Sequence, residues 1–197
     1  MEDPFRFLER EYPKPRASIA ELERDIAEGD APVSRALGRL LSVLVHCMQA
    51  NRVLEIGTGY GYATLWMALA LPPAGRIWTF DPDIERTEVA RTYFERAGAA
   101  ERIEIINQPA LEVLPIFPQR NMDIVFIDPF SSSRAGSNYA AYVEHSLPLL
   151  KLSGLIVVNR LPGSAEEGFI KRFLNHPQLD ATIVPLPTGI GIGARKQ

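Results

Sequence analysis

The sequence predicts an α/β fold with a doubly wound, mostly parallel sheet, and three observations support this prediction. From residue 53 onward, apolar runs of strand length alternate with segments of helical periodicity. The first run ends in closely spaced glycines that lead into a helix. The 197 residues, 46% of them hydrophobic, suffice for one sizeable core. We expect a single domain over 1–197, with a helical cap over 1–50 and an α/β core over 51–197.

Helical segments are expected before the sheet begins. Ser18 and Glu21 have the spacing of a capping box, which predicts a short helix running towards Glu28. Behind Ser34, leucine, valine and methionine residues recur at helical spacing and give one apolar face for packing on the sheet. Cys47, the single cysteine, lies in this second helix, and we expect its thiol to be buried and inert.

Strands and helices then alternate through the core. Strands are expected near residues 52–57, 76–80, 102–107, 123–128 and 154–159. Helices are expected near residues 61–71, 84–97, 109–117, 138–150 and 164–175. Residues 181–185 and 190–195 flank a turn and predict a short antiparallel hairpin at one edge of the sheet. Open α/β sheets bind ligands at the carboxyl ends of their strands, where we expect the functional residues to gather.

The loop after the first strand is the strongest functional signal. Gly57, Gly59 and Gly61 allow the backbone to approach a ligand closely, because glycine has no Cβ atom. Their G-x-G-x-G spacing differs from the dinucleotide fingerprint and from the triphosphate loop, and a tight turn without a ligand is the alternative. Asp81 ends the second strand, where a carboxylate can bind both hydroxyls of a ribose, and it could also cap the helix that begins near Ile84. Together, the loop and Asp81 predict a ribose-containing cofactor.

Composition narrows the range of partners. The chain has 21 basic and 24 acidic residues and a formal net charge of −3, so it has no excess of positive charge to attract nucleic acid. No apolar run has the length needed to span a bilayer, and no signal-peptide core follows the charged N-terminus. We therefore expect a cytoplasmic protein that acts on a small molecule and binds neither nucleic acid nor membrane.

Ordered sequence matches indicate a family. From about Pro32 onward, the chain resembles the catechol and caffeoyl-CoA O-methyltransferases, which use S-adenosylmethionine. The matching segments are residues 38–41, 53–58, 61–63, 69–72, 75–77, 97–98, 126–128, 139–142, 147–150 and 154–157. The resemblance implies the class I methyltransferase (Rossmann-like) fold and a homodimer. With the glycine loop and the turn after strand two, it assigns the cofactor contacts to Val33, Glu55, Gly57, Thr58, Gly59, Ala63, Asp81, Pro82, Ala110 and Asp128.

Two parts of the chain depart from this family. Ala63 stands where the family usually has a serine that touches the cofactor's carboxylate. The family also binds a divalent cation with an aspartate ending strand four and an Asp-Asn pair ending strand five, and has a lysine three residues after the first aspartate. Here those positions hold Asp128, Asn159, Arg160 and Ser131. Hard cations prefer anionic oxygen ligands, so we expect metal binding to be badly weakened and assign no metal ligands.

Two interpretations of Arg160 follow from the sequence. In one, its guanidinium replaces the cation and holds a phenolate, enolate or carboxylate while Asp128, beside Asn159, aligns the acceptor or takes its proton. In the other, Arg160 only pairs with Asp128 in a structural salt bridge. Our leading hypothesis is metal-independent methyl transfer to a small phenolic or enolic hydroxyl. The alternative is a homologue that binds the cofactor but has lost catalysis and has a regulatory or interaction role.

Overall fold

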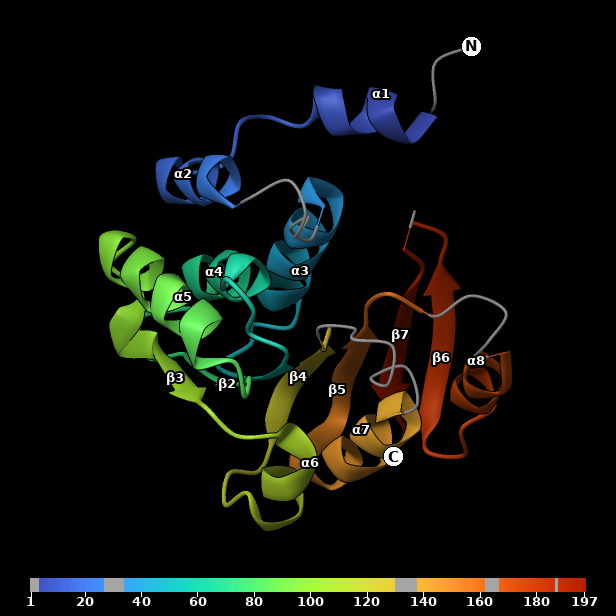
Figure 1. Ribbon diagram of the computed structural model, residues 1–197. Helices are drawn as coiled ribbons and strands as arrows, with labels where there is room; N and C mark the ends of the chain where they lie inside the picture. Colours follow the sequence, from blue (N-terminus) through green and yellow to red (C-terminus); the bar gives the residue numbers. More distant parts are fainter. Residues whose placement is uncertain (1–3, 27–33, 130–137, 162–166, 187) are drawn as a thin grey trace.

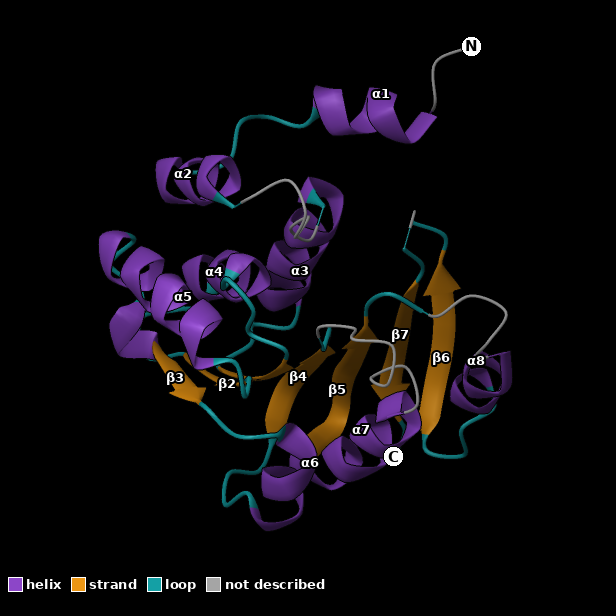
Figure 2. Ribbon diagram, viewed as in Figure 1, coloured by secondary structure: helices purple, strands orange, loops and turns teal. Residues whose placement is uncertain are grey.

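A seven-stranded sheet forms the centre of the protein. The computed structural model describes residues 4–26, 34–129, 138–161, 167–186 and 188–197. The strands are β1 (Arg52–Ile56), β2 (Arg76–Phe80), β3 (Ile103–Ile106), β4 (Met122–Ile127), β5 (Leu150–Val158), β6 (Leu179–Val184) and β7 (Ile190–Arg195). They lie in the order β3-β2-β1-β4-β5-β7-β6, with helices on both faces (Figure 1, Figure 2). The predicted fold class is confirmed.

The pairing of the strands locates the ligand-binding edge. The first five strands pair in parallel, while β7 runs antiparallel to both β5 and β6. The predicted C-terminal hairpin is therefore present, with β7 against β5 and β6 at the edge of the sheet. The direction of strand order reverses between β1 and β4, and this switch point is where open α/β sheets bind their ligands.

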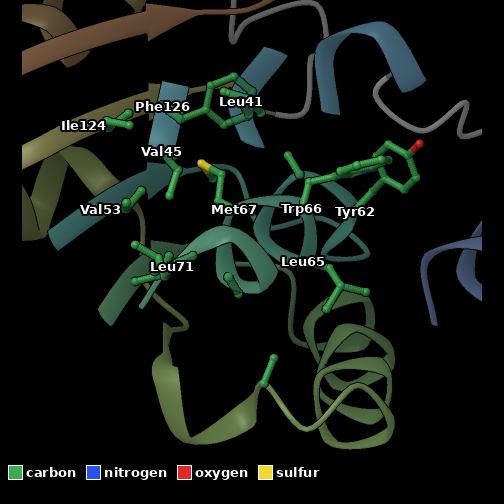
Figure 3. Packing of buried hydrophobic residues seen from close by; sticks show 14 of the residues in the cluster. Leu41, Val45, Val53, Tyr62, Leu65, Trp66, Met67, Leu71, Ile124 and Phe126 are labelled. Carbon is green, nitrogen blue, oxygen red and sulfur yellow. The ribbon is translucent and has the colours of Figure 1, made fainter. Parts of the chain in front are cut away.

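Helices α3 to α5 and helices α6 to α8 cover opposite faces of the sheet (Figure 1). Their bounds are α3 (Arg35–Cys47), α4 (Tyr62–Ala70), α5 (Ile84–Arg96), α6 (Ala110–Val113), α7 (Tyr139–Ser146) and α8 (Glu167–Leu174). Side chains alternate between the two faces along each strand, so Ile124 and Phe126 of β4 pack with α3 and α4 (Figure 3), whereas Val125 and Ile127 pack on the other side. Both faces are buried, as expected for parallel strands.

Two predicted helices end earlier than expected, each at a proline. The helix expected at 109–117 is α6 followed by a 3₁₀ turn at Leu114–Ile116, and the helix expected at 138–150 is α7 followed by a 3₁₀ turn at Leu147–Leu149. Pro115 and Pro148 lie in these turns, and a proline has no N–H with which to continue an α-helical ladder. Strand β5 consequently begins at residue 150, four residues before the predicted start.

The N-terminal helices differ from the prediction in their caps. Helices α1 (Pro4–Glu11) and α2 (Ala17–Asp25) precede the sheet, and α1 was not expected. The predicted capping box is wrong, because Arg16 is the N-cap of α2 and makes no side-chain capping bond. Glu21 instead pairs with Arg96 of α5 at 2.6 Å, so a tertiary contact takes the side chain that a capping box requires.

Helix α3 begins after Ser34, as predicted, but the prediction for its cysteine is wrong. Ser34 accepts a hydrogen bond from the backbone N–H of Leu37 at 3.2 Å. Leu41 and Val45 are buried on the apolar face, but Cys47 is exposed. Two helical residues separate the side chains by about 200°, so a position two after Val45 points away from the core. Within the described residues, no helix has the length and apolar character needed to cross a membrane.

Candidate functional site

The three glycines after β1 meet different surroundings. All have positive φ, which L-residues with a Cβ rarely adopt. A Cβ atom at Gly57 would overlap the carbonyl oxygen of Asp128, and one at Gly61 would lie 2.5 Å from the Phe94 ring. A Cβ atom at Gly59 would meet nothing within 4 Å. Close packing of the protein therefore requires glycine at the first and third positions, and only Gly59 faces open space where a ligand could approach.

Asp81 binds the glycine loop. One carboxylate oxygen accepts from the Gly59 N–H at 2.7 Å, and the other accepts from the Asp83 N–H at 3.0 Å. The alternative that Asp81 caps the following helix is wrong, because Asp83 is the N-cap of α5 and accepts from the Arg86 N–H at 3.1 Å. A carboxylate has about four acceptor positions, so Asp81 keeps capacity for ribose hydroxyls. Pro82, the next predicted contact, is exposed.

Glu55 lies fully buried beneath this loop, on the same face of the sheet as α4. Its Oε2 accepts from the Thr64 hydroxyl at 2.5 Å and from the Thr79 hydroxyl at 2.6 Å. Its Oε1 has no hydrogen-bond partner among the described residues. Burial raises the pKa of Glu55 to about 8, and the negative charges of Asp128 and Asp81 add to the rise. Ionisation of Glu55 at this buried position is therefore unfavourable, and its Oε1 atom can still accept a hydrogen bond.

Sequence reasoning predicted Thr58 but missed Thr64 and Thr79, the two threonines that donate to Glu55. Thr79 is the register partner of Glu55 across the β1–β2 pair. The hydroxyl of Thr58, which is also buried, shares a 2.7 Å hydrogen bond with the hydroxyl of Thr79. A polar residue inside the apolar run of strand two was the available signal for Thr79. Thr64 carried no comparable signal, because the turn between Gly61 and the helix determines where its hydroxyl points.

The predicted acceptor residues come together at the ends of β4 and β5. The Asp128 N–H donates to Ile56 O at 2.8 Å, and the Asn159 N–H donates to Ile127 O at 2.9 Å, so both residues extend the parallel ladder. Arg160 has φ +52°, a left-handed conformation that is uncommon for a non-glycine residue. Its Nε lies 3.0 Å from Oδ1 of Asp128. The strand ends thus bring the predicted trio into one cluster.

The charges of this cluster are unevenly exposed. The Asp128 side chain is 6% exposed, and the Arg160 side chain is 38% exposed. Burial raises the pKa of Asp128, while the positive charge of Arg160 and a hydrogen bond from Asn159 oppose the rise. A strained backbone conformation beside a buried carboxylate is typical of functional sites. Arg160 and Asp128 therefore form the ion pair that one interpretation of the sequence predicts. The Arg160 guanidinium nevertheless stays partly exposed, so a bound acceptor could still reach it.

The donor set does not fit a hard divalent cation. The carboxylate of Asp128 already faces the Arg160 guanidinium at 3.0 Å, and Oδ1 of Asn159 accepts from the Thr188 hydroxyl at 2.8 Å. A cation here would meet a fixed positive charge and one anionic ligand. No group of three or more His, Cys, Asp or Glu side chains within the described parts of the chain is arranged to hold a metal ion.

The remaining predicted residues have simpler surroundings. Ala63 is buried in the first turn of α4, and its methyl group cannot replace the hydroxyl of the family's serine. Ala110 is buried at the start of α6. Val33 and Ser131 lie outside the described residues.

Comparisons with known proteins agree with this geometry. The O-methyltransferase family matches residues 18–163. A catechol O-methyltransferase of Mycobacterium tuberculosis is 35% identical over 165 residues, which cover 77% of this chain and 73% of the relative. Caffeoyl-CoA O-methyltransferase 1 of Zea mays is 35% identical over 153 residues, which cover 74% of this chain and 57% of the relative.

Solved structures extend the similarity to the whole chain. The structure of cofactor-bound Rv0187 from MTB aligns with a TM-score of 0.87 and 27% identity, covering 100% of this chain and 99% of the other. The O-methyltransferase TomG from Streptomyces achromogenes, in complex with SAM, aligns with a TM-score of 0.83 and 25% identity, covering 98% and 96%. The family resemblance seen in the sequence is confirmed.

Proposed function

The chain belongs to the O-methyltransferase family of S-adenosylmethionine-dependent enzymes, and from this premise we propose that it methylates a small phenolic or enolic hydroxyl without a divalent metal. The observation that carries the proposal is the 3.0 Å contact between Arg160 Nε and Asp128 Oδ1 at the carboxyl end of β4. The contact lies beside the glycine loop, because the backbone of Asp128 packs directly against Gly57. The proposed binding sites for the methyl donor and the acceptor are therefore adjacent.

The residues around the glycine loop fit the cofactor. S-adenosylmethionine, when bound, supplies a methyl group on a positively charged sulfur and also carries an ammonium group. Asp81 is placed to accept from ribose hydroxyls, and Gly59 leaves space for close approach. Asp81 and Asp128 are near enough for their negative charges to raise the pKa of Glu55, so this region favours a cationic ligand. The free Oε1 of Glu55 is an acceptor for such a ligand.

The acceptor half needs to bind an oxygen and stabilise its negative charge. Bound S-adenosylmethionine would supply the methyl group to the acceptor oxygen and leave as the neutral thioether, and the carboxylate of Asp128 would take the hydroxyl proton. Because burial raises the pKa of Asp128, it accepts a proton more readily than an ordinary aspartate does. Arg160 offers several N–H donors in a planar fork, which suits a phenolate or enolate oxygen. Alignment of donor and nucleophile supplies much of the remaining rate enhancement.

A transfer assay tests the proposed activity. Purified protein is incubated with methyl-labelled S-adenosylmethionine and a panel of phenols, enols, amines and thiols, each in the presence of a chelator. We expect label to move to at least one phenol or enol. Binding of the cofactor with no transfer to any acceptor would contradict the proposal and support the inactive alternative, which no observation favours at present. Transfer only to amines or thiols would contradict the hydroxyl acceptor.

A further inference from the structure

The turn between β6 and β7 contacts the acceptor end of β5 at two points. Thr188 Oγ1 donates to Oδ1 of Asn159 at 2.8 Å, and the Leu161 N–H donates to Gly189 O at 3.3 Å. Gly189 has φ +67°, and a Cβ atom there would lie 3.2 Å from Cβ of Leu161. The hairpin turn is therefore seated on the strand end that carries Asn159 and Arg160.

The side-chain amide of Asn159 lies between a hydrogen-bond acceptor, the Asp128 carboxylate, and a hydrogen-bond donor, the Thr188 hydroxyl. Asn159 is 2% exposed and lies beside Asp128, because the two residues follow β5 and β4 in register and the Asn159 N–H donates to Ile127 O. A hydrogen bond from Asn159 works against the rise in the pKa of the Asp128 carboxylate, which only accepts. The amide must therefore present its N–H₂ to Asp128 and its oxygen to the Thr188 hydroxyl. Thr188 itself is exposed, so it reaches this buried amide from the surface of the turn.

Removal of the Thr188 hydroxyl would leave a buried acceptor without its donor. An unsatisfied buried polar group is unfavourable, because it has lost water without gaining a partner in the protein. The guanidinium of Arg160 also faces the Asp128 carboxylate. If the Asn159 amide rotated to turn its oxygen towards these groups, it would lose its bond to Asp128. The Thr188 hydroxyl opposes that rotation by engaging the amide oxygen on the other side.

We propose that Thr188 is a positioning residue for methyl transfer, because its hydroxyl fixes the orientation in which Asn159 donates to Asp128. The catalytic consequence rests on the proposed function, whereas the orientation of the amide does not. Nothing in the sequence pointed to Thr188, since it stands in a turn far along the chain from the other site residues. The contact between the hairpin and β5 brings it to the site.

Thr188→Val and Thr188→Ser test the proposal, with Thr182→Val as the matched control. Thr182 is also an exposed threonine of this hairpin, in the middle of β6. The first readout is NMR of the Asn159 side-chain amide, assigned by its loss in Asn159→Ser. Loss of one hydrogen bond worth about 1 kcal/mol should speed hydrogen exchange of this amide about fivefold in Thr188→Val, with recovery in Thr188→Ser.

The second readout is transfer kinetics. In Thr188→Val we expect kcat to fall about fivefold while the affinity for adenosylhomocysteine stays within about twofold, and Thr188→Ser to restore kcat. An unchanged amide signal in Thr188→Val, or the same changes in Thr182→Val, would overturn the proposal. If the wild-type protein transfers no methyl group, the proposed function fails, and the amide readout still decides whether Thr188 orients Asn159.

Discussion

Strand β4 has an aspartate at each end, and the protein surrounds the two in different ways. Asp123, near the amino end, accepts from the backbone N–H groups of Asn51 and Arg52 at 2.7 and 2.8 Å and pairs with Lys151. Asp128, just after the carboxyl end, has an Oδ1 atom that no described residue hydrogen-bonds, although Arg160 lies 3.0 Å from it. Both side chains are less than 10% exposed.

We propose that this difference separates a structural carboxylate, Asp123, from a functional one, Asp128. Backbone donors hold Asp123 to the segment that begins β1, so its charge helps to fix one strand beside the other. At Asp128 burial raises the pKa, and the opposing cation sits on a partly exposed side chain that a ligand can also reach. Buried polar groups with incomplete partners are uncommon in proteins and are candidates for function.

The largest expected effect is at the carboxyl end. Arg160→Ala should lower kcat/KM about a hundredfold, because a charge-assisted contact to the developing negative charge is worth about 2–3 kcal/mol. The affinity for adenosylhomocysteine should stay within about twofold. Arg160→Lys is the matched control and should recover only part of the rate, because an ammonium lacks the planar fork. Steady-state kinetics and calorimetric titration measure both quantities, and unchanged transfer in Arg160→Ala would contradict the proposed role.

The amino end should respond in stability instead. Asp123→Ala removes the acceptor of two partly buried hydrogen bonds from backbone N–H groups, together with one ion pair, so the free energy of unfolding should fall by about 2 kcal/mol. Urea denaturation measures the loss. Cofactor affinity and kcat should not change under conditions where the variant is folded. If Asp123→Ala lost activity without losing stability, the distinction between the two ends of β4 would be wrong.

A smaller effect distinguishes two glycines of the loop. Gly59→Ala should cost about 1 kcal/mol of stability, because a single left-handed residue is its only strain. Gly57→Ala should cost more, since its Cβ atom would overlap the backbone at Asp128. The Gly59 variant should instead lose affinity for adenosylhomocysteine. Thermal denaturation and titration of both variants make the comparison, and equal losses of stability would count against it.

Glu55 gives the prediction that depends on pH. Its pKa is raised from 4.5 to about 8, so folding favours the protonated form. The stability of the wild type relative to Glu55→Gln should be greatest below pH 4.5 and should decline as the pH rises through 8. Urea denaturation of both proteins across this range measures the difference. Parallel stability curves would show that Glu55 does not titrate with a raised pKa.

The fold could be predicted well from the sequence because the short-range sequence patterns agree with the tertiary structure. Alternation of strands with helices, the glycine turn and the hairpin at the C-terminus all have short-range causes. The capping box at Ser18 failed because Glu21 found a partner in α5, a contact that residue spacing cannot reveal. The prediction for Cys47 was wrong because Cys47 lies on the side of α3 opposite the buried Leu41 and Val45.

The candidate site was predictable where strand ends determine it. Asp128, Asn159 and Arg160 follow neighbouring parallel strands, so their meeting follows from topology. Thr188 depends instead on how a turn seats on the end of β5, and nothing local encodes that. The left-handed conformation of Arg160 was likewise outside what the sequence pattern predicts.

The dependence of methyl transfer on Mg²⁺ tests most directly whether the Arg160 guanidinium takes the place of a metal. The rate is measured for wild-type protein freed of metal by a chelator and then titrated with Mg²⁺, with a metal-requiring relative treated in parallel. We predict the same kcat/KM before and after titration. A rate that vanishes in the chelator and returns with Mg²⁺ would contradict the claim.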